Sequence, residues 1–83
     1  MNSPRFTCPV CGFPRLEEPP YDKTGNSTFE ICRCCGTEFG YDDANRSHAE
    51  LRQEWIKAGM KWWDDNPPPG WDAKAQLRDA GLD

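Results

Sequence analysis

Two pairs of closely spaced cysteines constrain this chain of 83 residues more than any other feature. Each pair has the Cys-x-x-Cys spacing, which lets two thiolates bind one metal ion from a single tight turn. A glycine follows each pair, and a turn of this kind often needs a positive φ, which glycine adopts at no steric cost. The sequence therefore predicts a metal site with four sulfur ligands: Cys8, Cys11, Cys32 and Cys35.

Zinc is the metal that the sequence favours, with one Zn²⁺ per chain. An all-sulfur tetrahedral set suits an ion that needs no open coordination position, although iron could occupy the same four thiolates. Disulfides are the alternative, but five cysteines would leave one unpaired. The first fifteen residues also lack the apolar run of a signal peptide. We therefore expect reduced cysteines in a cytoplasmic protein.

Two further residues could carry chemistry, and we interpret both as structural. Cys34 lies beside the ligands, and we expect it to be a small buried side chain without reactivity. His48 falls in the first turn of a predicted helix, without a visible nucleophile or second base nearby in sequence. A site closed by four thiolates leaves no position for a catalytic water, so we predict that the protein is not an enzyme. Electron transfer would become possible if iron were bound.

The fold class predicted for the chain is a small, metal-stapled α+β protein. With 83 residues, of which 36% are apolar, the chain forms a single domain, 1–83, whose small core needs a metal for stability. Residues 5–41 are predicted to form a zinc-ribbon-like module in which two metal-binding turns, or knuckles, sit in short β-hairpins, with a strand over 27–31. Residues 42–83 form a helical extension, rich in tryptophan and proline, that packs on this module.

The helical extension carries clear start and stop signals. Ser47 and Glu50 form a capping box, which predicts a helix from this point to about Ala58, before Gly59. The proline run over 67–69 interrupts helical structure, and Asp72 can cap a short second helix over 73–80. No stretch has the length and apolarity of a membrane span, so we expect no membrane association.

The charge balance argues against nucleic acid as the partner. The chain has a formal net charge of −4, whereas affinity for a phosphate backbone depends on several lysines or arginines. A nucleic-acid-binding zinc ribbon nevertheless remains an alternative function. It would use a small face for stacking and phosphate binding made of Arg5, Phe13, Arg15 and Arg33.

The four tryptophans suggest a different kind of partner. Trp55 lies on the apolar stripe of the first predicted helix and is expected in the core, but Trp62, Trp63 and Trp71 flank the prolines and cannot all face inward. An exposed tryptophan is a common anchor of protein interfaces. We therefore predict a non-catalytic protein-binding module with an acidic, tryptophan-bearing surface. Its candidate contacts are Asp42, Asp43, Trp62, Trp63, Asp64 and Asp65.

The two knuckles, with Glu30-Ile31 before the second and the segment 39–45 after it, resemble the bacterial cysteine-rich CPCC domain family. The resemblance covers roughly residues 5–50 and implies a small zinc-ribbon protein. It also implies a role as an immunity protein beside a bacterial toxin. The first knuckle reads Cys-Pro-Val-Cys, so the doubled cysteine of the family is absent there and occurs instead as Cys34-Cys35. This departure raises the question of which second-knuckle cysteines bind the metal.

Overall fold

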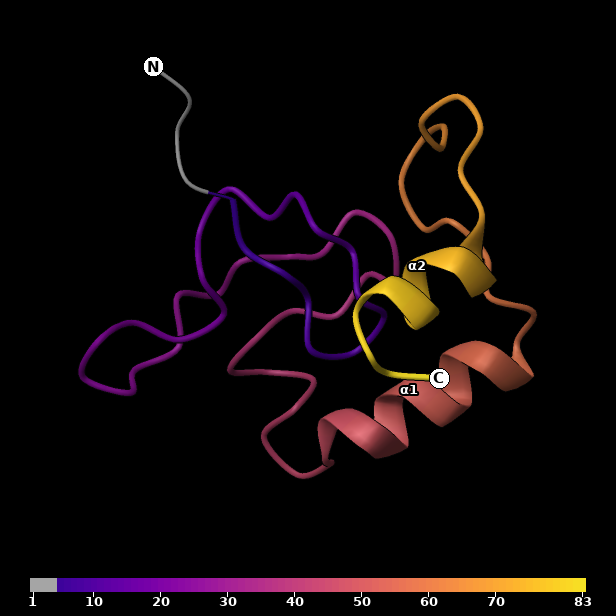
Figure 1. The fold of residues 1–83 in the computed structure, drawn as a ribbon. Helices are drawn as coiled ribbons and strands as arrows, with labels where there is room; N and C mark the ends of the chain where they lie inside the picture. Colours follow the sequence, from indigo (N-terminus) through magenta and orange to yellow (C-terminus); the bar gives the residue numbers. More distant parts are fainter. Residues whose placement is uncertain (1–4) are drawn as a thin grey trace, which may run out of the picture.

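A computed structural model describes residues 5–83 of the chain. The N-terminal half consists of loops and turns, and two helices follow it: α1, His48–Lys57, and α2, Ala73–Asp79. Figure 1 shows both helices on one side of the looped half, joined by a long excursion of the chain. The predicted order, a cysteine-bearing half followed by two helices, is therefore confirmed.

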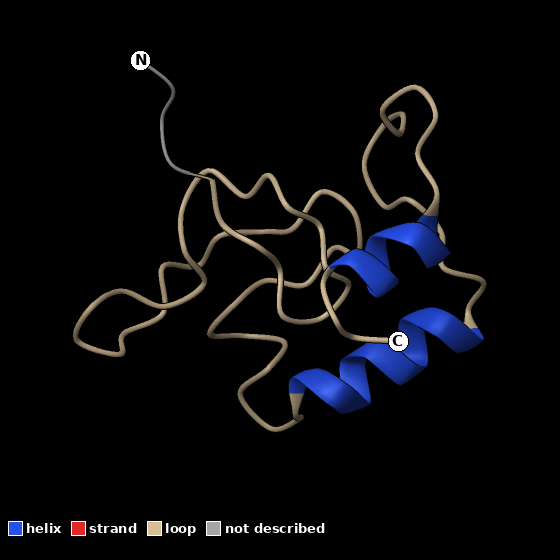
Figure 2. Ribbon diagram, in the orientation of Figure 1, coloured by secondary structure: helices blue, strands red, loops and turns tan. Residues whose placement is uncertain are grey.

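The looped half contains fewer β contacts than the sequence predicts. No strand is present among residues 5–83, as Figure 2 shows. The chain instead forms three isolated antiparallel bridges: Phe6 with Leu16, Tyr21 with Ser27, and Ile31 with Glu38. The strand expected over 27–31 is absent, because the backbone turns left-handed at Phe29 (φ 58°), and this interrupts an extended conformation. The first and third bridges flank the two knuckles.

Helix α1 begins and ends at the signals seen in the sequence. The Ser47 hydroxyl accepts a hydrogen bond from the Glu50 amide, and the Glu50 carboxylate accepts one from the Ser47 amide, both at 3.0 Å. At the other end, Gly59 has a φ of 103° and the Met60 amide donates to the Trp55 carbonyl. This bond closes a Schellman motif. The capping box and the stop near Ala58 are confirmed.

Helix α2 is short and is capped at both ends. The Asp72 carboxylate accepts hydrogen bonds from the amides of Lys74 and Ala75. After the helix, Gly81 adopts a φ of 72° and the Leu82 amide donates to the Leu77 carbonyl. The predicted cap is confirmed, and the helix ends one residue earlier than expected.

The core is built around the cysteines. Its buried apolar members come from both halves of the chain: Cys8, Val10, Cys11, Phe13, Leu16, Cys32, Cys34, Phe39, Trp55 and Leu77. Trp55 is 8% exposed, which confirms its predicted place in the core. A series of edge-to-face rings extends this core outward, with Trp62 centred 5.5 Å from Phe13 and 5.3 Å from Trp71. A small core with so few large aliphatic side chains usually needs further stabilisation, such as a bound metal.

Neither helix of the described chain is long and apolar enough to cross a membrane.

Candidate metal centre

The four cysteines predicted as ligands come together at one point. Their sulfur atoms all lie within 4.8 Å of one another, with Cys8 Sγ 3.8 Å from Cys35 Sγ and Cys11 Sγ 3.6 Å from Cys32 Sγ. Four thiolates bound tetrahedrally at about 2.3 Å from a zinc ion are about 3.8 Å apart. The separations are far longer than a disulfide bond of about 2.0 Å. The four sulfurs are therefore free thiols, positioned to bind a metal ion.

The two knuckles have the same local geometry. Gly12 donates its amide to the Cys8 carbonyl at 2.9 Å, and Gly36 donates to the Cys32 carbonyl at 2.8 Å. Both glycines have positive φ, 84° and 77°, as the sequence predicts. The Cys8 amide in turn bonds to the Phe13 carbonyl at 2.8 Å. Each turn thus contributes two of the four clustered sulfurs.

The glycines have a second role that the sequence did not reveal. A Cβ at Gly12 would lie 2.8 Å from the Cβ of Ala80, just after α2, and one at Gly36 would lie 2.5 Å from the Trp63 ring. Both distances are too short for any side chain to fit without displacement. Absence of a side chain therefore lets later segments of the chain approach the knuckles closely.

The thiols perturb one another strongly. The pKa of Cys11 is raised far above its ordinary value, first by its hydrogen bond to Cys32 and additionally by burial. The pKa of Cys35 is lowered, because the thiols of Cys11 and Cys32 hydrogen-bond to its sulfur. Such a cluster can lose all of its protons only when a cation offsets the negative charge. The chemistry of the donor set therefore fits a metal ion.

Cys34 is fully buried but lies outside the group of four. Its sulfur accepts a hydrogen bond of 3.3 Å from the Gln76 side-chain amide. The pKa of Cys34 is lowered, first by hydrogen bonding to Cys11 and then, against burial, by this amide donor. The geometry thus answers the question raised by the doubled cysteine, because Cys35 and not Cys34 joins the other three.

Both helices anchor the first knuckle through side chains that the sequence analysis missed. Arg52 of α1 donates to the carbonyls of Pro9 and Val10, each at 2.8 Å. Gln76 of α2 is buried and donates to the Cys11 carbonyl at 2.9 Å. No local pattern could have identified these residues, although a glutamine on the buried face of a short helix is an uncommon feature that calls for polar partners.

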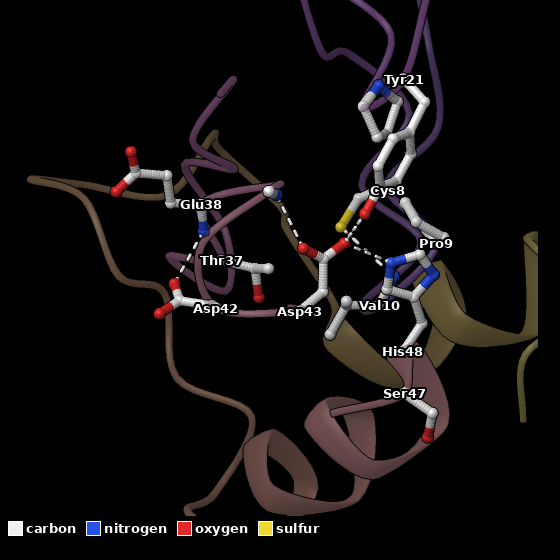
Figure 3. Close-up of polar contacts among 12 residues, drawn as sticks. Cys8, Pro9, Val10, Tyr21, Thr37, Glu38, Asp42, Asp43, Ser47 and His48 are labelled. Atoms are coloured by element: carbon white, nitrogen blue, oxygen red, sulfur yellow. Dashed lines mark hydrogen bonds and ion pairs between the residues drawn. The ribbon is translucent and has the colours of Figure 1, made fainter. Parts of the chain in front are cut away.

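His48 belongs to a separate polar network centred on Asp43, shown in Figure 3. The Asp43 side chain is only 2% exposed and accepts from the Tyr21 hydroxyl, from His48 Nε2 at 2.8 Å and from the Gly40 amide at 2.7 Å. Burial opposes ionisation of Asp43, but these donors outweigh it and lower its pKa. Through Asp43, the network links the loop at Tyr21 to His48 at the start of α1.

The pKa of Tyr21 is sensitive to this network. Its hydrogen bond to Asp43, with smaller contributions from burial and from the carboxylate charge, raises its pKa from 10.0 to about 12. A raised pKa in the folded state stabilises the protein fully below pH 10, and this contribution is lost as the pH rises through about 12. We expect Asp43→Asn to return the Tyr21 pKa toward 10, as measured by an NMR titration of the phenol ring.

Asp42→Asn is the matched control for this titration. Asp42 accepts from the Glu38 amide at 2.8 Å and has no bond to Tyr21. The control should therefore leave the Tyr21 midpoint in place. An unchanged midpoint in Asp43→Asn would contradict the network.

The predicted partner-binding residues differ in accessibility. The carboxylate of Asp43 is buried in its network, and Trp62 is half-buried between Phe13 and Trp71. Trp63 is 58% exposed. Asp64 and Asp65 are exposed beside it.

Comparison with known proteins gives few relatives. No family model matches the chain, and no solved structure matches it. Two uncharacterised proteins of Bacillus subtilis (strain 168), YoaQ and YozI, are each 30% identical to it, over 66% and 68% of this chain. The chain spans about 60% of the length of each relative. Because neither relative's name states a function, the function must be inferred from the geometry.

Proposed function

We propose that this protein is a non-catalytic zinc-binding module that binds another protein. In this proposal one zinc ion, held by the four clustered cysteines, supplies structural stability and no reaction. The N-terminal half is a reduced zinc ribbon of the CPCC type, in which a single antiparallel bridge takes the place of each knuckle hairpin. The observation that carries the proposal is the clustering of the four buried or half-buried sulfurs within 4.8 Å of one another.

A surface beside the second knuckle supports the binding role. The Trp63 amide donates to the Cys34 carbonyl at 2.9 Å, and the Asp64 amide donates to the Arg33 carbonyl at 3.0 Å. The Trp63 ring lies over Gly36 and remains largely exposed. The backbone of the second knuckle therefore holds a tryptophan and the adjacent acids, Asp64 and Asp65, on the outside of the protein. A rigid exposed aromatic side chain of this kind is a typical interface anchor.

The charge of this surface favours a basic partner. Complementary charge speeds and orients association, and proteins that act on nucleic acid are commonly basic. A toxin directed at nucleic acid is a partner of this kind, which makes an immunity role a specific form of the proposal.

Trp63→Ala tests the binding surface. We expect wild-type protein to retain a partner from extracts of the native host, and the variant to lose it, with a loss in affinity of about 2 kcal/mol or more, as for interface hot spots. The variant should still bind one metal ion per chain. Phe29→Ala removes an aromatic side chain of the same 58% exposure and serves as control. Equal retention by the two variants would contradict the role of Trp63.

A further inference from the structure

A pocket on the first knuckle gathers half of the arginines in this acidic chain. Of the six arginines, three line a cavity of about 280 Å³: Arg5 before the first knuckle, Arg15 after it, and Arg33 within the second. Phe13 and Trp62 form the apolar part of the wall. These residues come from three distant segments, so only the folded chain brings them together.

The arginines of this pocket have few partners of their own. In the chain from residue 5 onward, Arg5 and Arg15 form no ion pair and no side-chain hydrogen bond. Arg33 has one loose pair with Glu17, at 3.8 Å, between two exposed side chains. Such a pair contributes little to stability. By contrast, Arg52 and Arg46 are both hydrogen-bonded elsewhere. The guanidinium groups of the pocket are therefore available to an anion.

The other residues that line the pocket favour a ligand with more groups than a simple anion. Glu17 and Asp64 also line it and can accept hydrogen bonds from hydroxyl or amino groups. The Trp62 indole Nε1 is buried without an acceptor in the described chain. Buried donors without a hydrogen-bond partner are uncommon in native proteins. Arginine planes and aromatic rings together offer stacking surfaces for a flat heterocycle. This combination of groups matches a phosphate joined to a sugar and a base.

We infer that this pocket binds a nucleoside phosphate, with Arg5, Arg15 and Arg33 holding the phosphate and the aromatic wall contacting the base. A volume of about 280 Å³ accommodates about one such unit. Outside the pocket the chain is acidic, with a formal net charge of −4 overall, and it repels a longer phosphate backbone. The ligand is therefore a free mononucleotide or a single nucleotide unit of a single strand, not a duplex.

An NMR titration with AMP tests this inference on the metal-loaded full chain. We expect saturable shifts at the Trp62 indole and at the backbone amides of Phe13 and Arg15, weakening as salt rises. Adenosine and inorganic phosphate should each bind at least about tenfold more weakly, because each lacks half of the contacts. A phosphoserine peptide or inorganic phosphate that binds as tightly as AMP would overturn the assignment, and so would no binding of AMP.

Variants place the ligand in the pocket. Arg15→Gln should weaken AMP binding by about tenfold, the loss of one charge-assisted hydrogen bond. Arg78→Gln makes the same charge change on an exposed side chain paired only with its neighbour Asp79. This control should bind AMP as the wild type does. Metal content and circular dichroism verify that both variants fold, and equal affinities for the two folded variants would refute the location.

A second series of ligands distinguishes a free nucleotide from a nucleotide within a nucleic acid strand. A single-stranded oligonucleotide that binds more tightly than AMP, with the same dependence on Arg15, would identify a nucleic acid strand as the ligand. Equal affinities would identify the free nucleotide. Tight binding of duplex DNA that is insensitive to Arg15→Gln would contradict the inference. Asp64 is shared by this pocket and the surface around Trp63, but Trp63 itself does not line the pocket, so Trp63→Ala can fail its own test without affecting any of these outcomes.

Discussion

Cys32→Ser is expected to abolish stoichiometric metal binding and to leave the chain largely unfolded. The Cys32 sulfur is fully buried and lies 3.6 Å from that of Cys11. Structural zinc contributes about 10 kcal/mol or more to the folding of small domains, which is comparable to their whole stability of about 5–15 kcal/mol. Elemental analysis and circular dichroism of the purified variant measure the two effects.

Cys34→Ser is the matched control, because it makes the same chemical change two positions along. Its sulfur is also fully buried but lies outside the group of four. This variant should bind one metal ion per chain and remain folded, with a modest loss of stability. If Cys34→Ser lost its metal while Cys32→Ser kept it, the ligand assignment would be wrong. A wild-type chain that stays folded in a strong chelator would contradict the structural role of the metal.

Gln76→Ala has the second largest expected effect. The Gln76 side chain donates to the Cys11 carbonyl and the Cys34 sulfur, and its oxygen accepts from Trp71 Nε1 at 2.8 Å. Removing it leaves these buried groups without partners and opens a cavity. We expect the free energy of unfolding of the metal-loaded protein to fall by roughly 2–4 kcal/mol, as measured by urea denaturation.

One further variant separates the hydrogen bonds of Gln76 from its shape, and a second serves as a control for the loss of a glutamine. Gln76→Glu keeps the size of the side chain and an acceptor for Trp71, but it loses the amide donor and adds a negative charge beside the thiolates. It should therefore weaken metal binding, which a competition assay with a chelator can measure. Gln53→Ala removes an exposed glutamine from α1 and should change stability by less than about 0.5 kcal/mol. Equal stabilities of Gln76→Ala and Gln53→Ala would show that α2 is not anchored in this way.

The features that the sequence predicts well are local ones. A Cys-x-x-Cys-Gly turn is determined by a few adjacent residues, and so are the caps at Ser47 and Asp72. The meeting of the two knuckles could also be predicted, because four sulfurs in a small core have a common use in binding a metal. These predictions needed no knowledge of how distant segments pack.

The features that the sequence did not reveal depend on tertiary contacts. Arg52 and Gln76 reach carbonyls 42 to 65 residues away in the chain, and their positions in the helices resemble ordinary polar positions. Single bridges are present where hairpins were expected. The turns of the knuckles and the left-handed backbone at Phe29 interrupt regular strand pairing. Likewise, nothing local distinguishes Asp43, which is buried, from its neighbour Asp42. Burial of polar groups is decided by the assembled fold.

The contacts between the helices and the first knuckle have a consequence for the order of folding. The carbonyls that accept hydrogen bonds from Arg52 and Gln76 belong to Pro9, Val10 and Cys11, which lie within the first metal-binding turn. We therefore expect docking of the C-terminal half to depend on metal binding by the N-terminal half. The rate at which the amide hydrogens of α1 and α2 exchange with solvent would then report the fraction of the protein that has bound metal.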